Sequence, residues 1–153
     1  MTREQFVTEL DRQVKLVRTE YGFTQDTMAK ALGLSKKTLV QIEKGRASLG
    51  WTGAVALSAV FADSQVLAGV LGGEGSDMVR ALAFADRPPR FPRTMGGKVW
   101  WRTAEVRGHY RIQQNILSQH YRLLDGEDRR LGSSFDLEQM RALAEEAERR
   151  RET

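Results

Sequence analysis

Two short segments that meet across a tight turn constrain this chain more than any other feature of its sequence. Thr24 and Ser35 have the hydroxyl side chains that cap helix N-termini, and Gly33 and Gly45 have the freedom to end a helix. Within the segments, apolar residues recur at spacings of three and four, as on the buried face of a helix. The pattern predicts two short helices joined at Gly33 and Leu34 by a turn that sets them at a steep angle.

More helices are predicted on both sides of this pair. An amphipathic pattern predicts a helix over residues 3–21. The apolar run over residues 52–71 breaks near Asp63 and Ser64, which predicts two further helices that close the core. Together these elements predict an all-α domain of five helices over residues 1–72.

The chain changes character after this domain. Residues 73–97 begin with clustered glycines, continue with a short helical pattern over 77–85 and end in a basic stretch whose prolines exclude regular helix. We interpret them as a linker. The basic stretch has two open interpretations, a solvated connection or an arm that contacts DNA phosphates.

Residues 98–153 predict a separate β domain. Four short aromatic and β-branched runs alternate with turn signals such as Arg107-Gly108 and Asp125-Gly126. This alternation predicts a four-stranded antiparallel meander. The whole chain is therefore expected to belong to the α+β class.

A closing helix is predicted after the meander. Asp136 and Gln139 have the spacing of a capping box, and the charged tail after Ala147 is expected to fray. The helix has one apolar stripe. Its residues are Leu137, Met140, Leu143, Ala144 and Ala147.

The composition excludes several classes of protein. The 153 residues contain no cysteine, 41% are hydrophobic and the net charge is +4. Neither a signal peptide nor a membrane-spanning run is present, so we expect a cytoplasmic protein with no membrane partner. The mild basic excess permits nucleic-acid binding without requiring it.

The sequence gives little support to catalysis. It has no nucleophile motif, paired carboxylates or phosphate-binding glycine loop, so we expect no enzyme activity and no catalytic residues. His109 and His120 lack the spacing of metal ligands. We expect neither a metal site nor a cofactor.

Residues 14–46 resemble the XRE family of helix-turn-helix regulators, which includes the phage repressors and Cro proteins. The resemblance implies a lambda-repressor-like DNA-binding domain. The residues that match the family pattern are Arg18, Gly22, Phe23, Thr24, Gln25, Ala29, Gly33, Ser35, Ile42, Glu43 and Gly45.

Helix 35–44 is expected to enter the major groove of double-stranded DNA, which admits an α-helix and presents a distinct pattern of donors and acceptors for each base pair. Lys37 and Gln41 are the strongest candidates for contacts with base edges. The full set of candidate base-reading residues is Lys36, Lys37, Val40 and Gln41.

Other polar residues of the motif are expected to contact the DNA backbone. They are Thr24, Gln25, Ser35, Thr38, Lys44 and Arg46. The resemblance implies that Gln25 clamps a phosphate, and that Arg18 and Glu43 form an internal ion pair. Glu43 is then structural rather than a reader of bases.

These features predict a sequence-specific transcriptional regulator, a repressor, that binds a near-palindrome as a homodimer. The dimer interface is expected in the β domain and on the helix around Met140. Two alternatives remain open. One is an antitoxin or adaptor whose β domain grips a protein partner, and the other is a ligand-responsive repressor whose small effector lies at Trp100 and Trp101.

Overall fold

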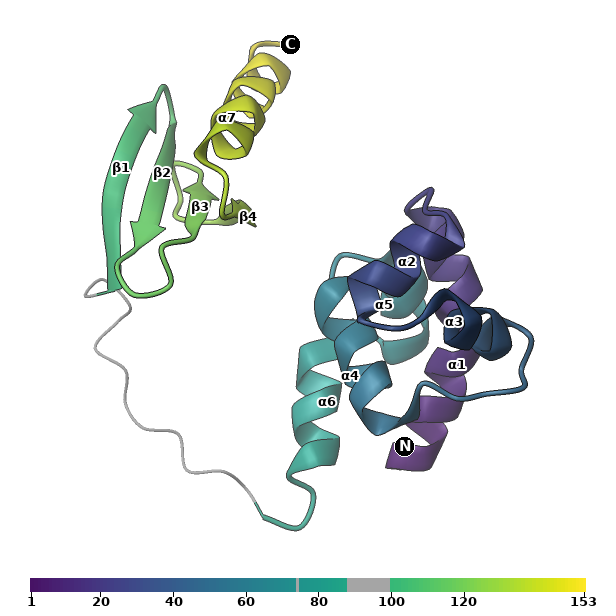
Figure 1. Ribbon diagram of the computed structural model, residues 1–153. Coiled ribbons are helices and arrows are strands. Elements are labelled where there is room, and N and C mark those ends of the chain that lie inside the picture. Colours follow the sequence, from purple (N-terminus) through teal and green to yellow (C-terminus); the bar gives the residue numbers. More distant parts are fainter. Residues whose placement is uncertain (74, 88–99) are drawn as a thin grey trace. The chain divides into compact units, whose positions relative to one another are not determined.

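The structure is a computed structural model that describes residues 1–73, 75–87 and 100–153. The chain forms two compact units, Met1–Arg90 and Phe91–Thr153. Within the described ranges, the first unit contains six helices, and the second contains a four-stranded antiparallel sheet and one helix (Figure 1). The predicted α+β class is confirmed.

The helices of the first unit follow the predicted pattern. Side-chain oxygens of Thr2, Thr24, Ser35 and Ser64 accept hydrogen bonds from backbone N–H groups and so cap four of the helices. The bounds are α1 (Arg3–Glu20), α2 (Gln25–Leu32), α3 (Lys36–Glu43), α4 (Gly50–Val60), α5 (Gln65–Leu71) and α6 (Gly75–Ala83).

The core of the first unit lies between α1, α4 and α5, and it also takes in the buried faces of α2 and α3. Phe61, at the end of α4, is 1% exposed and packs edge-on against Tyr21 and Phe23 at ring-centroid distances of 4.9 Å and 6.1 Å. Glu20 joins α1 to α5 because its carboxylate accepts hydrogen bonds from the Ser64 hydroxyl and from the Gln65 N–H at 2.7 Å. These contacts join the end of α1 to the start of α5.

Helix α6 belongs to the packing of the first unit, although the sequence pattern assigned it to the linker. Met78, Val79 and Leu82 pack against the helical core, and the Arg3 guanidinium donates hydrogen bonds to the carbonyls of Leu82 and Ala83. Residues 88–97 of the expected linker, including its prolines, lie outside the described residues. No helix in the described ranges is long and apolar enough to cross a membrane.

The second unit contains the predicted meander. The strands are β1 (Trp101–Arg107), β2 (Tyr110–Asn115), β3 (Tyr121–Leu124) and β4 (Arg130–Ser134), paired in the order β1-β2-β3-β4. A bulge between Thr103 and Glu105 leaves Ala104 without a partner on β2. In a regular strand, residues four apart share a face of the sheet. The unpaired Ala104 shifts this alternation, so Trp101 and Glu105 lie on opposite faces.

Helix α7 (Leu137–Glu152) covers one face of this sheet (Figure 1). Met140 and Ala144 are buried against Tyr110, Ile112 and Leu123, while other residues of the predicted stripe pack around them. The apolar stripe is therefore occupied within the subunit. A dimer interface on this stripe, as the sequence suggested, would require α7 to leave its own sheet.

Two predictions about α7 were wrong. Asp136 is the N-cap, but no capping box forms, because the Ser134 hydroxyl accepts from the Asp136 N–H and donates to the Gln139 side chain. The tail does not fray after Ala147 but stays helical to Glu152. Arginines in the last turn favour this extension because they interact well with the negative end of the helix dipole.

Candidate nucleic-acid interface

The turn between α2 and α3 has the geometry that its sequence predicts. Gly33 adopts φ = 70°, where side chains are strained, and its N–H bonds back to the carbonyls of Ala29 and Lys30. The Leu34 N–H also bonds to the Ala29 carbonyl, at 2.8 Å. Ser35 then begins α3 by accepting a hydrogen bond from the Thr38 N–H at 3.1 Å. A short rigid connection thus fixes α3 relative to α2.

One side of helix α3 packs into the core, and the opposite side faces outward. Leu39 and Ile42 are buried. In a helix of about 3.6 residues per turn, Lys37, Gln41 and Lys44 lie on the opposite side and form one polar row. The Lys37 and Lys44 residues are exposed, and Gln41 is half-buried. This row is the part of α3 that is accessible to a partner.

An ion pair between Arg18 and Glu43 fixes the position of α3. The Arg18 guanidinium donates to both carboxylate oxygens of Glu43, at 2.5 Å and 3.3 Å, and to the carbonyl of Phe23 at 3.1 Å. The Gln25 amide donates to Glu43 at 2.8 Å. The Glu43 side chain is only 6% exposed. Three elements, α1, α2 and α3, therefore meet at one buried carboxylate.

The surroundings of Glu43 keep it ionised. Burial alone would raise the pKa of Glu43, but hydrogen bonds from Arg18 and Gln25 and the positive charges of Arg18 and Lys15 outweigh burial and lower this pKa. Since Glu43 is neutralised by Arg18, it does not repel an incoming phosphate.

The other candidate DNA contacts differ in how far their side chains are already engaged. Lys36 forms an exposed ion pair with Asp26 at 3.2 Å, and Gln25 gives one amide hydrogen to Glu43, which leaves it one for another acceptor. The Ser35 hydroxyl donates to Thr38, and the Thr24 hydroxyl pairs with that of Thr27. Val40 is half-buried on α3, and Arg46 is exposed just beyond it.

The charge around α3 favours an anionic partner. Within residues 36–46 the cations are Lys36, Lys37, Lys44 and Arg46, and the single acid is Glu43. Asp26 opposes Lys36, and Arg18 opposes Glu43. The exposed charge that remains at Lys37, Lys44 and Arg46 is positive, which attracts the phosphate backbone of a nucleic acid.

One anchor of this surface, Asp11, is not apparent from the sequence. The carboxylate of Asp11 on α1 accepts a hydrogen bond from the Leu49 N–H at 2.8 Å. This contact ties down the segment that follows α3, which includes the exposed Arg46. Asp11 has no sequence signal that separates it from the other acids of α1, because its partner is a backbone group distant in sequence.

Comparison with known proteins supports the assignment of α2 and α3 as a candidate nucleic-acid interface. Residues 14–50 match the sequence profile of the helix-turn-helix family, and this segment contains α2, α3 and the last seven residues of α1. No curated protein and no solved structure matches the chain significantly. With its capped helices, its glycine turn and its polar outer row, the matched segment over residues 14–50 has the form of an XRE-type helix-turn-helix, the DNA-binding element of a family of transcription regulators.

Proposed function

We propose that the protein is a cytoplasmic, sequence-specific repressor that inserts residues 35–44 into the major groove of double-stranded DNA. The observation that supports this most is the polar row of Lys37, Gln41 and Lys44 on the side of α3 opposite its buried residues. Direct readout of base edges requires a helix that is fixed by packing on its buried side and presents hydrogen-bonding side chains on its exposed side.

Each residue of the recognition helix has a distinct proposed role. Lys37 donates to guanine O6 and N7, Gln41 pairs with adenine N6 and N7, and Val40 contacts a thymine methyl group. Lys36 reads a base only if it leaves Asp26, so its contribution is the smallest of the four.

The DNA backbone is held by the ends of α2 and α3. The first backbone N–H groups of each helix have no partner further back in the helix, and they carry the positive end of the helix dipole. Two phosphates near these N-termini would explain the hydroxyl and amide side chains gathered there. The proposed backbone contacts are Thr24, Gln25, Ser35, Thr38, Lys44 and Arg46.

Replacing Lys37 and Gln41 with alanine is expected to weaken binding to the preferred site by a factor on the order of 30 or more, because each bidentate base contact contributes roughly 1–3 kcal/mol. The preferred site is first obtained by selection from random and genomic DNA fragments. Binding to it is then measured for both proteins at two salt concentrations.

A matched control removes one cation and one amide outside the helix-turn-helix. The variant Gln65→Ala with Arg149→Ala, at two exposed residues, is expected to bind like the wild type. If the Lys37 and Gln41 variant selects the same sites with the same affinity, α3 is only a scaffold. The protein is then better explained as an adaptor whose second unit binds a protein partner.

We further propose that the protein binds DNA as a homodimer. A single helix-turn-helix makes few base contacts, and a two-fold dimer places its recognition helices in successive major grooves about 34–36 Å apart. Selected sites are therefore expected to be inverted repeats with half-sites about one helical turn apart. Sedimentation with a duplex that carries a complete repeat should give two chains per duplex, and one chain per duplex would contradict the dimer.

A further inference from the structure

The sheet of the second unit has one face that α7 does not cover, and we call this the open face. Paired residues of neighbouring antiparallel strands point to the same side of a sheet. Ile112 and Leu123 are paired and pack under α7, so the alternate pairs belong to the open face. In this unit α7 is the only helix among the described residues.

A polar row crosses the middle of the open face. The register pairs Thr103 with Gln113, Gln113 with Arg122, and Arg122 with Ser133. Arg122 stacks on Trp101, with its guanidinium carbon 3.9 Å from the ring centroid. It also donates two hydrogen bonds, of 3.0 Å and 2.8 Å, to the Gln113 side-chain oxygen. Arg122 is therefore held rigidly while its charge is not neutralised.

A second row beside the first adds two more arginines. The register pairs Arg111 with Leu124, and Leu124 with Arg130. Leu124 is only 4% exposed, although it lies on the face away from α7. Burial lowers the pKa of Arg122, and the positive charges of Arg130 and Arg111 lower it further. The three arginines repel one another and so favour a bound anion.

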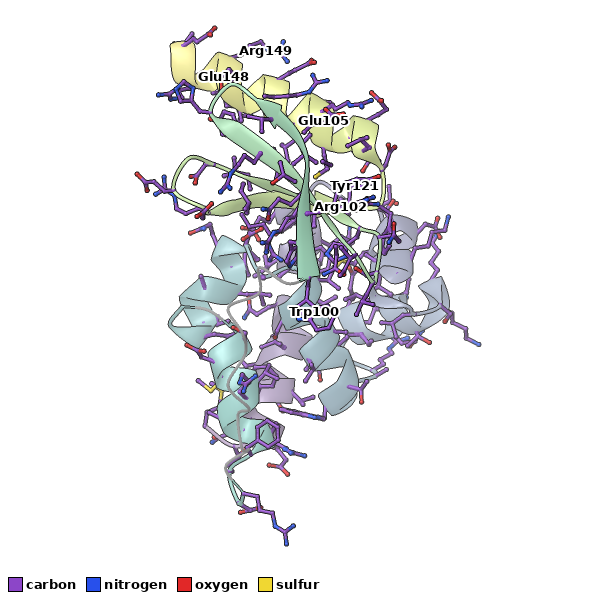
Figure 2. All side chains as sticks on the ribbon, turned by 90° about the vertical axis from the view of Figure 1, so that its left-hand side faces the viewer. Trp100, Arg102, Glu105, Tyr121, Glu148 and Arg149 are labelled. Atoms are coloured by element: carbon purple, nitrogen blue, oxygen red, sulfur yellow. The ribbon has the colours of Figure 1, made fainter. Side chains whose placement is uncertain are left out.

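The acids of the second unit lie elsewhere. No strand position of the open face carries a carboxylate, and among the described residues Asp128, in the turn before β4, is the one acid paired with an arginine of this cluster, Arg111. Glu105 lies next to α7 (Figure 2), where hydrogen bonds from Arg141 and Arg107 outweigh burial and lower its pKa to about 2. The strand positions of the open face thus carry arginines without carboxylates, whereas the α7 side carries both acids and arginines.

We propose that the open face, centred on Arg111, Arg122 and Arg130, is a second surface that binds the phosphate backbone of double-stranded DNA. The proposal rests on the proposed function, because a helix-turn-helix on the same chain keeps DNA at a high local concentration near this face. A second copy of the chain is a poor occupant, because a two-fold contact would place like-charged clusters opposite each other.

The dimensions of the sheet suit this partner. Four strands spaced about 4.8 Å apart span roughly 14 Å, comparable to the width of about 12 Å of the major groove. At this width the sheet does not enter the groove, which admits an α-helix or a two-stranded ribbon, and its open face lies instead across the phosphates at the groove edges.

The test uses the full chain with Arg111→Gln and Arg130→Gln. Arg122 is left in place because it packs on Trp101. The control, Arg149→Gln with Arg150→Gln, removes the same charge from α7, where Figure 2 shows Arg149.

Binding of a 40-base-pair duplex, a length chosen for the assay at about four helical turns, is measured over a series of salt concentrations. The open-face variant is expected to lower the slope of log K against log salt by about 1.8, and to weaken binding at least about tenfold at 0.1 M salt. The control is expected to bind like the wild type.

Each other outcome has a definite meaning. Equal slopes and affinities for the open-face variant and the wild type would overturn the proposal, as would an equal loss in the control. A loss confined to single-stranded RNA would overturn it in favour of RNA. The Lys37→Ala and Gln41→Ala variant, measured in parallel, tests the proposed function by itself, since wild-type site selection there contradicts only the role of α3.

Discussion

Replacing Arg18 with methionine is expected to destabilise the helical unit by about 3 kcal/mol, near the lower end of the cost of breaking a buried ion pair. The Glu43 carboxylate would keep its hydrogen bond from Gln25 but lose both bonds from the guanidinium. With 6% of its side chain exposed, Glu43 has little access to water as a substitute. Urea denaturation followed by circular dichroism measures the change.

The pH dependence of this variant identifies the cause. In the wild type the pKa of Glu43 lies below its usual value of 4.5, so the ion pair stabilises the fold above that pH and is lost as the pH falls through the lowered pKa. Without Arg18, burial dominates and the pKa of Glu43 rises. The penalty of the substitution should therefore be largest at neutral pH and should shrink as the pH falls toward 4.5.

Arg12→Met is the matched control, because the Arg12 side chain is 71% exposed. Its replacement should change stability by less than about 1 kcal/mol. A similar loss in both variants, or a loss for Arg18→Met that does not depend on pH, would contradict the role assigned to the ion pair.

Replacing Phe61 with alanine is expected to cost about 4 kcal/mol, because the change leaves a cavity where a large aromatic side chain was buried. The Phe61 ring fills the space between Tyr21 and Phe23, which lie at the end of α1 and just before α2. The loss should therefore loosen the start of the helix-turn-helix as well as α4. The urea midpoint of the helical signal is the measurement.

Phe84→Ala provides the comparison, since Phe84 is 42% exposed. It loses the same atoms from a site where water already reaches them, and it should cost much less than Phe61→Ala. Equal costs at the two sites would show that the ring cluster does not hold the domain together.

The helices of the first unit were predictable because the information is local. Each of α2 and α3 begins at a hydroxyl residue that caps it, and Gly33 ends α2, so a short window of sequence determines the fold there. The meander was predictable for the same reason, since turn residues separate its strands. The outward position of Lys37 and Gln41 follows from helical periodicity once Leu39 and Ile42 are known to be buried.

The parts that could not be predicted depend on contacts between residues distant in sequence, or on competition between nearby groups. The hydrogen bond of Gln25 to Glu43 becomes visible only when α2 and α3 are placed together. Ser134 displaced the expected capping box because its hydroxyl reaches both groups that would have formed it. The stripe of α7 gave no indication of whether its own sheet or a second subunit would cover it.

The bulge at Ala104 has a consequence for how this chain tolerates change. In a regular strand every second residue shares a face, so Trp101 and Glu105 would lie together. The unpaired residue assigns the two halves of β1 to different surfaces, Glu105 to the α7 side and Trp101 to the arginine cluster. Pairing of Ala104 with β2 would put Trp101 and Glu105 on one face, whereas deletion of Ala104 would keep them on opposite faces of a regular strand. The presence of one unpaired residue, rather than the identity of its side chain, thus determines to which surface each half of β1 contributes.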